Sequence, residues 1–379
     1  MSSPSRILFT SVIRAAILEI QRKVFVPRGS VSSPQRQKRP TLADVSTATG
    51  VSQATVSKAL NGRGDVSPET RERILGAAAQ LGYRPTTGPA RDGSRQSVVV
   101  VFDVPASPYI LGVFQGVLAA STESGVDLVT RLAPDRAART QRPVANEWIA
   151  DQQAAGVAGV IGLTLSAPGE LISAAAEANV PFVIVDPVDA QHRPVVSIGS
   201  SNWAGARAAT EDLIGLGHRR IAWIGGPETS DAARDRLYGY QAAMDAAGLS
   251  VDPSLIRSGQ FTVESGMQQA REVLGSTQPP TAVMAASDEI AVGVLAAAHE
   301  LHIQVPEQLS VTGFDDTPQA TWTTPPLTTV HQHLEGLGRM AVETILSMAA
   351  GRSPASRHIE LATSLIRRES TGPAPASQS

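Results

Sequence analysis

Three side chains within one short segment have the chemistry needed to read the edges of DNA bases. Gln53 can both donate to and accept from an adenine, and Lys58 can donate to the acceptors of a guanine. Ala54 offers only a methyl group, which suits the methyl of a thymine. Their polar neighbours are suited to holding phosphates or packing a turn, namely Thr55, Ser57 and Asn61. These residue types predict contacts in a major groove.

The surrounding residues predict two short helices that would present these side chains. Thr41 can cap a first helix whose first turn carries Asp44, a favourable charge at that end. Gly50 ends this helix, because only glycine takes a left-handed turn at little cost, and Ser52 caps the next. Apolar residues at helical spacing predict the buried faces, which are Leu42, Val45 and Ala48 in the first helix and Val56, Ala59 and Leu60 in the second.

A third helix is predicted from Ser67, which caps it, and Pro68, which takes its first position. Its predicted buried stripe is Ile74, Leu75, Ala78 and Leu81, and it ends at Gly82. Two helices joined at a glycine turn form a helix-turn-helix, and the third encloses a small core with them. We therefore predict an all-α, three-helix DNA-binding headpiece over residues 41–84.

The charge of the chain is divided unevenly. Residues 1–97 hold 15 Lys and Arg against 6 Asp and Glu, a net of +9, whereas the remainder holds 17 against 29, a net of −12. A basic front on an acidic body indicates that the front binds a polyanion. The absence of cysteine excludes a disulfide framework, a thiolate zinc site and a cysteine nucleophile. It is compatible with a reducing compartment, and we expect a cytoplasmic protein with no cofactor and no metal.

The first forty residues are basic and only partly apolar. Charges interrupt the stretch from Ile7 to Val26, so it lacks the roughly 20 apolar residues of a membrane span. It also lacks the compact apolar region of a secretory signal. We expect no membrane association, and we interpret residues 1–40 as a basic extension that is disordered or not native.

The segment TLADVSTATGVSQATVSKALNGRGDVSPETRERILGAAAQLGYRP resembles the headpiece of the lac repressor family over its whole length. The resemblance rests on the ordered caps, Gly50, the Thr-Val-Ser-Lys run and the final Gly-Tyr-Arg-Pro. It implies a transcription regulator in which Gln53, Ala54 and Lys58 occupy the base-reading positions. We predict that the DNA-contacting residues are Thr41, Ser52, Gln53, Ala54, Thr55, Ser57, Lys58, Asn61, Tyr83 and Arg91.

Residues 85–97 are rich in Gly, Pro and polar residues and are predicted to be a hinge or linker. In the family this stretch usually becomes a short helix on DNA, and two such helices each push a leucine into the minor groove. The usual Ala-Arg-x-Leu pattern here ends in Gly93 instead of leucine. We therefore expect weaker wedging than is usual for the family, with Arg91 and Arg95 still able to bind phosphates.

From Ser97 onward, apolar strands alternate with Ala-rich helices, which predicts parallel sheets covered on both faces. The predicted strands are Val98–Phe102, Val157–Leu163, Phe182–Asp186, Ile221–Ile224, Ala282–Ala285 and Ser310–Phe314, and the helices include Trp203–Leu216, Ala232–Ala247 and Asp288–Leu301. Ligands in such sheets bind beyond the carboxyl ends of the strands. Those ends carry Asp103, Asp186, Ser287, Asp288, Asp315 and Asp316. We interpret Asp288 as the cap of the helix that follows it.

Several segments of the core resemble the same family, whose core is similar to periplasmic sugar-binding proteins. They are HRRIAWIGGP…RLYGY, VMAASDEIAVGVL, LSVTGFDDTP and PPLTTVHQ, and the resemblance extends over residues 41–369. It implies an α/β core of two lobes over residues 98–369, with crossovers near Ser197–Ser200 and Pro325–Thr329. By matching positions, the effector is placed among Tyr109, Asp186, Arg236, Phe261, Ser287, Asp315, Trp322 and Gln332.

The predicted function is a DNA-binding transcription regulator, a repressor, whose operator affinity is controlled by a sugar or sugar derivative between the lobes. One alternative is a corepressor-dependent regulator that binds a purine-like ligand, and another is a sugar-binding transport protein. We expect no enzyme, because no nucleophile-elbow or metal motif occurs. We predict residues 370–379 to be a disordered tail without apolar heptads, so we expect a homodimer on a palindrome rather than a tetramer.

Overall fold

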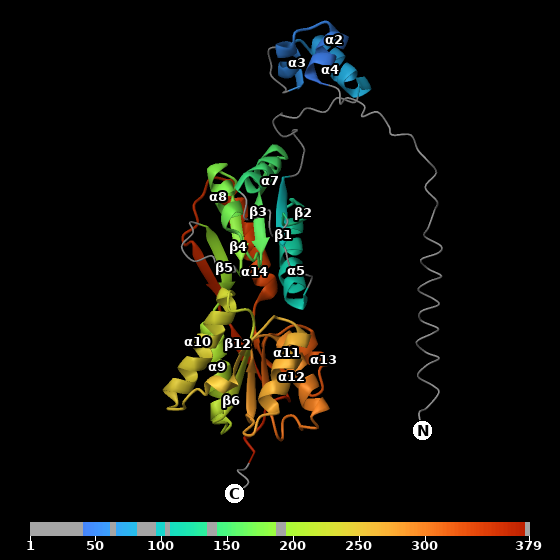
Figure 1. Cartoon of the computed structure of the whole chain (residues 1–379). Coiled ribbons are helices and arrows are strands. Elements are labelled where there is room, and N and C mark those ends of the chain that lie inside the picture. Colours follow the sequence, from blue (N-terminus) through green and yellow to red (C-terminus); the bar gives the residue numbers. More distant parts are fainter. Residues whose placement is uncertain are drawn as a thin grey trace, which may run out of the picture. The chain divides into compact units, whose positions relative to one another are not determined.

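A computed structural model of the 379-residue chain describes residues 41–60, 66–81, 96–102, 107–134, 142–186 and 195–375. The described residues fall into two compact units, one within residues 1–89 and one within residues 90–379, and their helices and strands are labelled in Figure 1. The first contains the predicted headpiece and the second the predicted core. No helix of the described residues is long and apolar enough to cross a membrane.

The headpiece consists of three helices that contact one another, α2 (Leu42–Thr49), α3 (Gln53–Leu60) and α4 (Pro68–Leu81). Its core is built from the buried side chains of Val45, Val56, Ala59, Val66, Ile74 and Ala78. The predicted stripes were partly wrong. Ala48 is exposed and Thr49 is buried in its place, with its hydroxyl donating to the Val45 carbonyl (2.7 Å). Leu75 and Leu81 are 48% and 39% exposed.

Local capping explains where these helices begin and end. The Asp44 carboxylate accepts from both the amide (2.6 Å) and the hydroxyl (2.8 Å) of Thr41 at the start of α2. Gly50 adopts φ 68°, and its amide donates to the Ser46 carbonyl (2.9 Å), which ends that helix. Ser52 then accepts from the amide of Thr55 (3.2 Å) and so caps α3.

The first lobe of the core is a six-stranded parallel sheet in the order β11-β5-β4-β3-β1-β2. Alternating residues of β1 point to opposite faces, as the two-residue period of a strand requires. Val98 and Val100 pack with α5 and α14, whereas Val99 and Val101 pack with α7 and α8. The elements are β1 (Ser97–Phe102), α5 (Pro108–Glu123), β2 (Asp127–Leu132), α7 (Arg142–Ala154), β3 (Val157–Leu163), α8 (Gly169–Glu177), β4 (Phe182–Val185), β5 (Val196–Ser200), α14 (Leu334–Ala349) and β11 (His358–Leu361).

The second lobe is a six-stranded sheet in the order β12-β10-β9-β8-β6-β7, in which only the β10–β12 pair is antiparallel. One continuous hydrophobic core lies beneath its helices and contains Trp223 and Tyr240. The elements are α9 (Asn202–Gly215), β6 (Ile221–Gly225), α10 (Asp231–Ala246), a 3-10 helix (Pro253–Leu255), β7 (Ile256–Ser258), α11 (Val263–Leu274), β8 (Ala282–Ala285), α12 (Asp288–Glu300), β9 (Ser310–Asp315), α13 (Gln319–Trp322), β10 (Thr328–His331) and β12 (Ser364–Ile366).

The chain passes between the lobes three times. The first crossover follows β5 at Ser200, as predicted. The second lies later than the predicted Pro325–Thr329, because β10 still belongs to the second sheet and α14 packs on the first. The third, between β11 and β12, was not predicted. Residues 332–333 and 362–363 are therefore two of the connections between the lobes.

The predicted start of a disordered tail at residue 370 was wrong. Ser370 is fully buried, and its hydroxyl donates to the Val311 carbonyl (2.6 Å) and accepts from the Thr328 amide (2.8 Å). The His218 ring, also buried, contacts the Gly372 carbonyl (3.1 Å), and the amide of Ala374 donates to the Leu216 carbonyl (2.8 Å). These bonds attach residues 370–374 to the second lobe.

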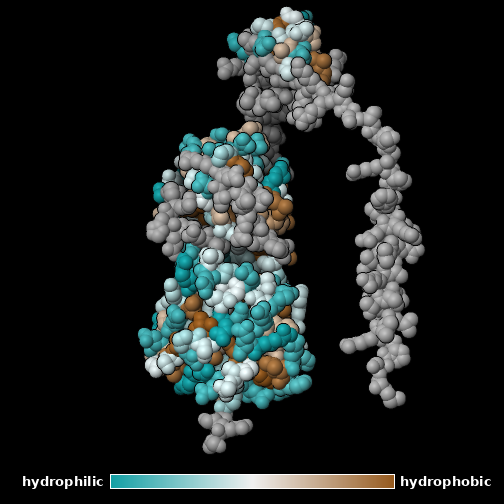
Figure 2. Space-filling view, viewed as in Figure 1, coloured by the Kyte–Doolittle hydropathy of each residue, from teal (hydrophilic) through white to brown (hydrophobic). Residues whose placement is uncertain are grey.

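The surface of the core is mostly hydrophilic, with separate hydrophobic patches (Figure 2). One patch lies along the edge of the first lobe that α5 and β2 form in this view. It agrees with the exposed fractions of three leucines on these elements, which are 57% for Leu111, 49% for Leu118 and 73% for Leu132. Exposed leucines gathered on neighbouring elements indicate an interaction surface.

Candidate DNA-binding and effector sites

The α3 helix presents the polar side chains predicted to read DNA. Gln53 in its first turn and Lys58 in its last turn are both exposed, as is Ser52 before it. Thr55 is half-buried, and its hydroxyl lies 2.9 Å from that of Ser52. The opposite side of the helix packs on the headpiece through Val56 and Ala59. An exposed helix face carrying an amide and an ammonium group fits the requirements of major-groove contacts.

The remaining predicted DNA contacts differ in what the structure describes. Thr41 is exposed at the start of α2. Ala54 and Ser57 lie on α3, but their side chains are outside the described part of the structure. Asn61, Tyr83 and Arg91 lie outside the described residues, as do Gly93 and Arg95 of the hinge and Asp103.

The first lobe contributes a tyrosine and an aspartate to a buried polar cluster. Tyr109 is the second residue of α5, which Ser107 caps by accepting from the Ile110 amide (3.2 Å). Its hydroxyl donates to the carboxylate of Asp186, which follows β4. Gly199 makes room for this carboxylate, because a Cβ atom there would lie 2.9 Å from Asp186 Oδ1.

The second lobe contributes an arginine held on several sides. Arg236 on α10 donates through Nε to Asn202 Oδ1 (2.7 Å) and through Nη1 to the Ala286 carbonyl (2.6 Å). The same Nη1 atom lies 3.3 Å from Asp315 Oδ1. The guanidinium carbon lies 3.8 Å from the centre of the Phe314 ring, a cation–π arrangement. Three segments, at the start of α9, after β8 and at the end of β9, therefore fix one buried guanidinium.

Asp315 connects the arginine to the crossover between the lobes. It ends β9 with φ 113°, a backbone conformation that non-glycine residues rarely adopt. Gln332 Nε2 donates to Asp315 Oδ1 (2.6 Å). The other amide atom, Gln332 Oε1, is buried and has no hydrogen-bond partner among the described residues. A buried acceptor without a donor is costly, so this oxygen is available to a hydroxyl of a ligand.

The cluster is rich in buried carboxylates. Burial raises the pKa of Asp186, and it raises that of Asp315 well above its usual value, although Arg236 lowers both. Burial also raises the pKa of the Tyr109 hydroxyl, and the negative charges of Asp186 and Asp315 raise it further. Residues of both lobes therefore raise the pKa of Tyr109. Such an arrangement can accept several hydrogen bonds from a neutral ligand.

Three predicted effector residues lie apart from this hydrogen-bonded cluster. Ser287 is buried and caps α12 by accepting from the Ile290 amide (3.2 Å), so the interpretation of Asp288 as that cap was wrong. Phe261 is half-buried, and its ring lies against Gly226, where a Cβ atom would be 2.4 Å from the ring. Trp322 is 76% exposed at the end of α13.

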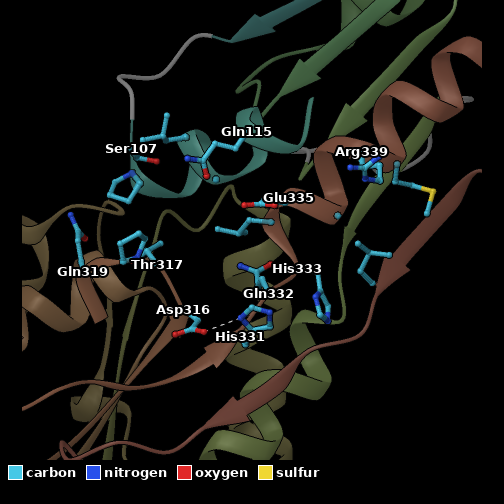
Figure 3. Close-up of a pocket in the computed structure, with 18 of the residues that line it drawn as sticks. Ser107, Gln115, Asp316, Thr317, Gln319, His331, Gln332, His333, Glu335 and Arg339 are labelled. Carbon is cyan, nitrogen blue, oxygen red and sulfur yellow. Dashed lines mark hydrogen bonds and ion pairs between the residues drawn. The ribbon is translucent and has the colours of Figure 1, made fainter. Parts of the chain in front are cut away.

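A side pocket of about 970 Å³ lies next to Gln332 and is lined by residues of both lobes (Figure 3). In Figure 3, Ser107 and Gln115 lie above Thr317 and Gln319, and Glu335 and Gln332 lie to their right. Trp322 also lines this pocket. The described residues include no group of His, Asp and Glu arranged to hold a metal ion.

Sequence reasoning missed several partners of the cluster. Asn202 lies just before the predicted helix Trp203–Leu216 and had no predicted role, and Ala286 contributes only its carbonyl, which no side-chain pattern reveals. Phe314 was interpreted as an ordinary strand residue, although its ring contacts Arg236. The position of Asn202 directly after the first crossover was the one signal that could have identified it.

Comparison with known proteins agrees with this arrangement. Residues 41–86 match bacterial regulatory proteins of the lacI family, and residues 210–371 match the periplasmic binding protein-like domain. The chain is 35% identical to the HTH-type transcriptional regulator CelR of Thermobifida fusca over 344 residues, which is 89% of this chain and 99% of that protein.

Two solved structures have the same fold. The complex of the transcriptional regulator CelR with cellobiose matches with a TM-score of 0.66 and 33% identity, over 88% of this chain and 100% of that one. The lac repressor dimer bound to operator and the anti-inducer ONPF matches with a TM-score of 0.65 and 29% identity, over 88% and 100%. A helix-turn-helix headpiece joined to a two-lobed α/β core defines a DNA-binding transcriptional regulator. The chain belongs to the lacI family of bacterial regulatory proteins, which confirms the predicted family and fold.

Proposed function

We propose that this regulator is a repressor that binds a palindromic operator as a homodimer through α3, and that a neutral sugar or sugar derivative between the lobes controls its operator affinity. In this proposal residues 41–84 form the headpiece, residues 85–97 the hinge, and residues 98–375 the effector-binding and dimerisation core. The protein acts by binding, without catalytic turnover, in the cytoplasm.

The carboxylate-rich cluster is the observation that supports this class of effector. Asp186 and Asp315 outnumber Arg236, and all three side chains are buried. An anionic effector would add negative charge to this site, whereas sugar hydroxyls donate hydrogen bonds to carboxylates. Gln332 Oε1 offers one more acceptor. The solved complex of CelR with cellobiose, a sugar, supports the same choice over a purine-like ligand.

The effector residues divide into two groups in this proposal. Tyr109, Asp186, Arg236, Asp315 and Gln332 provide the hydrogen bonds. Phe261 provides an apolar face for a sugar ring, Ser287 shapes the adjoining end of α12, and Trp322 contacts the part of the ligand nearest the side pocket. An effector changes the preferred arrangement of the lobes only to the extent that it binds one arrangement more tightly.

The exposed leucines Leu111, Leu118 and Leu132 support a dimer interface along α5 and β2. Such a dimer would pair two α3 helices with the two halves of a palindrome. The solved lac repressor structure is a dimer on its operator, which supports the same assembly here.

The proposal is tested by titrating a labelled operator, selected from genomic DNA by the full-length chain, in the presence and absence of neutral sugars. Arg236→Ala and Asp315→Ala should still bind operator but should no longer respond to the sugar. If the ligand is a corepressor instead, the same variants should fail to bind operator tightly. Arg271→Ala is the matched control, because it removes an arginine from an exposed ion pair with Glu300 in the same lobe. If Arg236→Ala and Asp315→Ala both responded to the sugar as the wild type does, the proposed effector site would be wrong.

A further inference from the structure

One buried carboxylate, that of Asp288, takes no part in the effector cluster and does not cap its own helix. Asp288 is the first residue of α12 and is completely buried. Ser287 already caps that helix. Burying a carboxylate is costly unless hydrogen bonds compensate for the lost water. The position of the Asp288 carboxylate therefore needs an explanation other than helix capping.

Three donors surround this carboxylate. Asp288 Oδ2 accepts from the amide (2.7 Å) and the hydroxyl (2.9 Å) of Thr317, and Oδ1 accepts from the hydroxyl of Thr329 (2.5 Å). Both threonines are buried. Gly313 provides the space, because a Cβ atom there would lie 2.5 Å from Oδ1. Burial raises the pKa of Asp288 to about 6, and the three bonds from Thr317 and Thr329 act against this rise, because each is donated to the carboxylate.

The two bonds from Thr317 hold the turn at residues 315–317, and the bond from Thr329 ties the same carboxylate to β10. Asp315 (φ 113°) and Asp316 (φ 56°) both have positive φ, which costs energy for residues with a side chain and persists only where the surroundings enforce it. The two carboxylates point in different directions. Asp315 reaches Arg236 and Gln332, whereas Asp316 Oδ2 accepts from His331 Nδ1 (2.9 Å) beside the side pocket (Figure 3).

We propose that Asp288 is a positioning residue for the effector site: it holds the strained turn at residues 315–317 and so aims Asp315 at the effector without contacting the effector itself. This inference rests on the proposed effector cluster. In Asp288→Asn one carboxylate oxygen becomes an amide nitrogen, so only one acceptor atom and no charge remain. The threonine hydroxyl that faces this nitrogen can no longer donate to residue 288 and has to accept from it instead. The expected consequence of that substitution is a turn that samples other backbone conformations and an Asp315 that is no longer fixed.

The test uses the full-length chain with four variants. Asp288→Asn removes the charge and one of the two acceptor oxygens of this side chain. Glu289→Gln is the control, because it removes a charge from the next residue of the same helix. Thr317→Val removes only the hydroxyl donor, and Thr317→Ser retains it. The Thr317 pair keeps the inference testable if Asp288→Asn fails to fold.

Two measurements are made on each variant. The first is amide hydrogen exchange of the peptide containing Thr317, without any sugar. The second is affinity for whichever of glucose, galactose, cellobiose, maltose or lactose shifts the melting temperature of the wild type most. We expect faster exchange and about tenfold weaker sugar binding for Asp288→Asn, and about threefold to tenfold weaker binding for Thr317→Val. Thr317→Ser and Glu289→Gln should behave as wild type, and operator affinity should be unchanged throughout.

The results separate this inference from its alternatives. A purely structural role for Asp288 would lower the melting temperature while leaving sugar affinity, measured below that temperature, at the wild-type value, and this result would overturn the inference. Equal losses of sugar affinity in Thr317→Ser and Thr317→Val would also overturn the inference. If none of the sugars binds the wild type, the proposed effector class is wrong. Hydrogen exchange at Thr317 then still tests whether Asp288 holds the turn at residues 315–317. Unchanged exchange at Thr317 in Asp288→Asn overturns the inference, and faster exchange supports it.

Discussion

Replacing Arg236 by methionine is expected to destabilise the second lobe far more than replacing a surface arginine. Methionine retains much of the apolar length of the side chain and removes the guanidinium. Asn202 Oδ1 and the Ala286 carbonyl then lose a donor, and Asp315 loses its counter-charge in a buried site. Removing one partner of a buried ion pair typically costs about 3–5 kcal/mol, and we expect a loss in this range.

Asp315→Asn should cost less, about 1–3 kcal/mol, because it leaves Arg236 its other partners and gives Gln332 an amide oxygen in place of the carboxylate. In the double variant, Arg236→Met with Asp315→Asn, no carboxylate at residue 315 is left without its counter-charge. The combined cost should therefore fall short of the sum of the single costs by about 1–3 kcal/mol.

The assay is urea unfolding at pH 7.5, followed by circular dichroism and by the fluorescence of tryptophan, including Trp223 in the core of the same lobe. Arg271→Met is the control, since its partner Glu300 is exposed and such pairs contribute about 0–1 kcal/mol. If Arg236→Met were as mild as Arg271→Met, or if the costs of Arg236→Met and Asp315→Asn were strictly additive, the account of a coupled buried pair would be wrong.

Four further predictions concern other parts of the chain. Lys58→Ala should weaken operator binding about tenfold and relax one base position in a binding-site selection, and equal discrimination by wild type and variant would contradict this. Gly226→Ala should displace the Phe261 ring and lower sugar affinity in calorimetry without altering operator affinity, because the new Cβ atom would lie 2.4 Å from that ring. Leu118→Glu should dissociate the dimer in sedimentation, whereas Leu301→Glu, which changes a leucine of similar exposure on the other lobe, should not. Finally, burial raises the pKa of Asp288 from 3.8 to about 6, so the folded protein binds more protons than the unfolded chain between about pH 4 and 6. Its contribution to the free energy of unfolding falls as pH rises through that window, and urea unfolding of Asp288→Asn at pH 4.5 and 7 should show a smaller pH dependence than wild type.

The parts of the fold that could be predicted from sequence are those with strong local signals. The buried strands β3 and β8 have the predicted bounds, since continuous apolar residues between turns have few other interpretations. The helices α9, α10 and α12 lie within one residue of prediction at each end. Edge strands such as β2, which is largely exposed, carry no such apolar signal and were not predicted.

Non-local features of the site were harder to predict. The second crossover was placed too early, because nothing in the local pattern shows that β10 pairs with β9 in the second lobe. Asp186 and Asp315 were identified as residues at strand ends. Their positive φ angles, and the lowering of both pKa values by the charge of Arg236, arise from tertiary contacts that the local sequence does not show. The three bonds of Asp288 join residues 29 and 41 positions apart, a separation that periodicity does not report.

The most direct test of the central claim is a selection of genomic DNA fragments by the full-length chain, followed by anisotropy titrations of the selected site with and without neutral sugars. The account predicts a palindromic motif and an operator affinity that one neutral sugar changes. Reciprocity requires that the operator change the sugar affinity by the same factor. Selection of no common motif, or an operator affinity that no neutral sugar alters, would contradict the account.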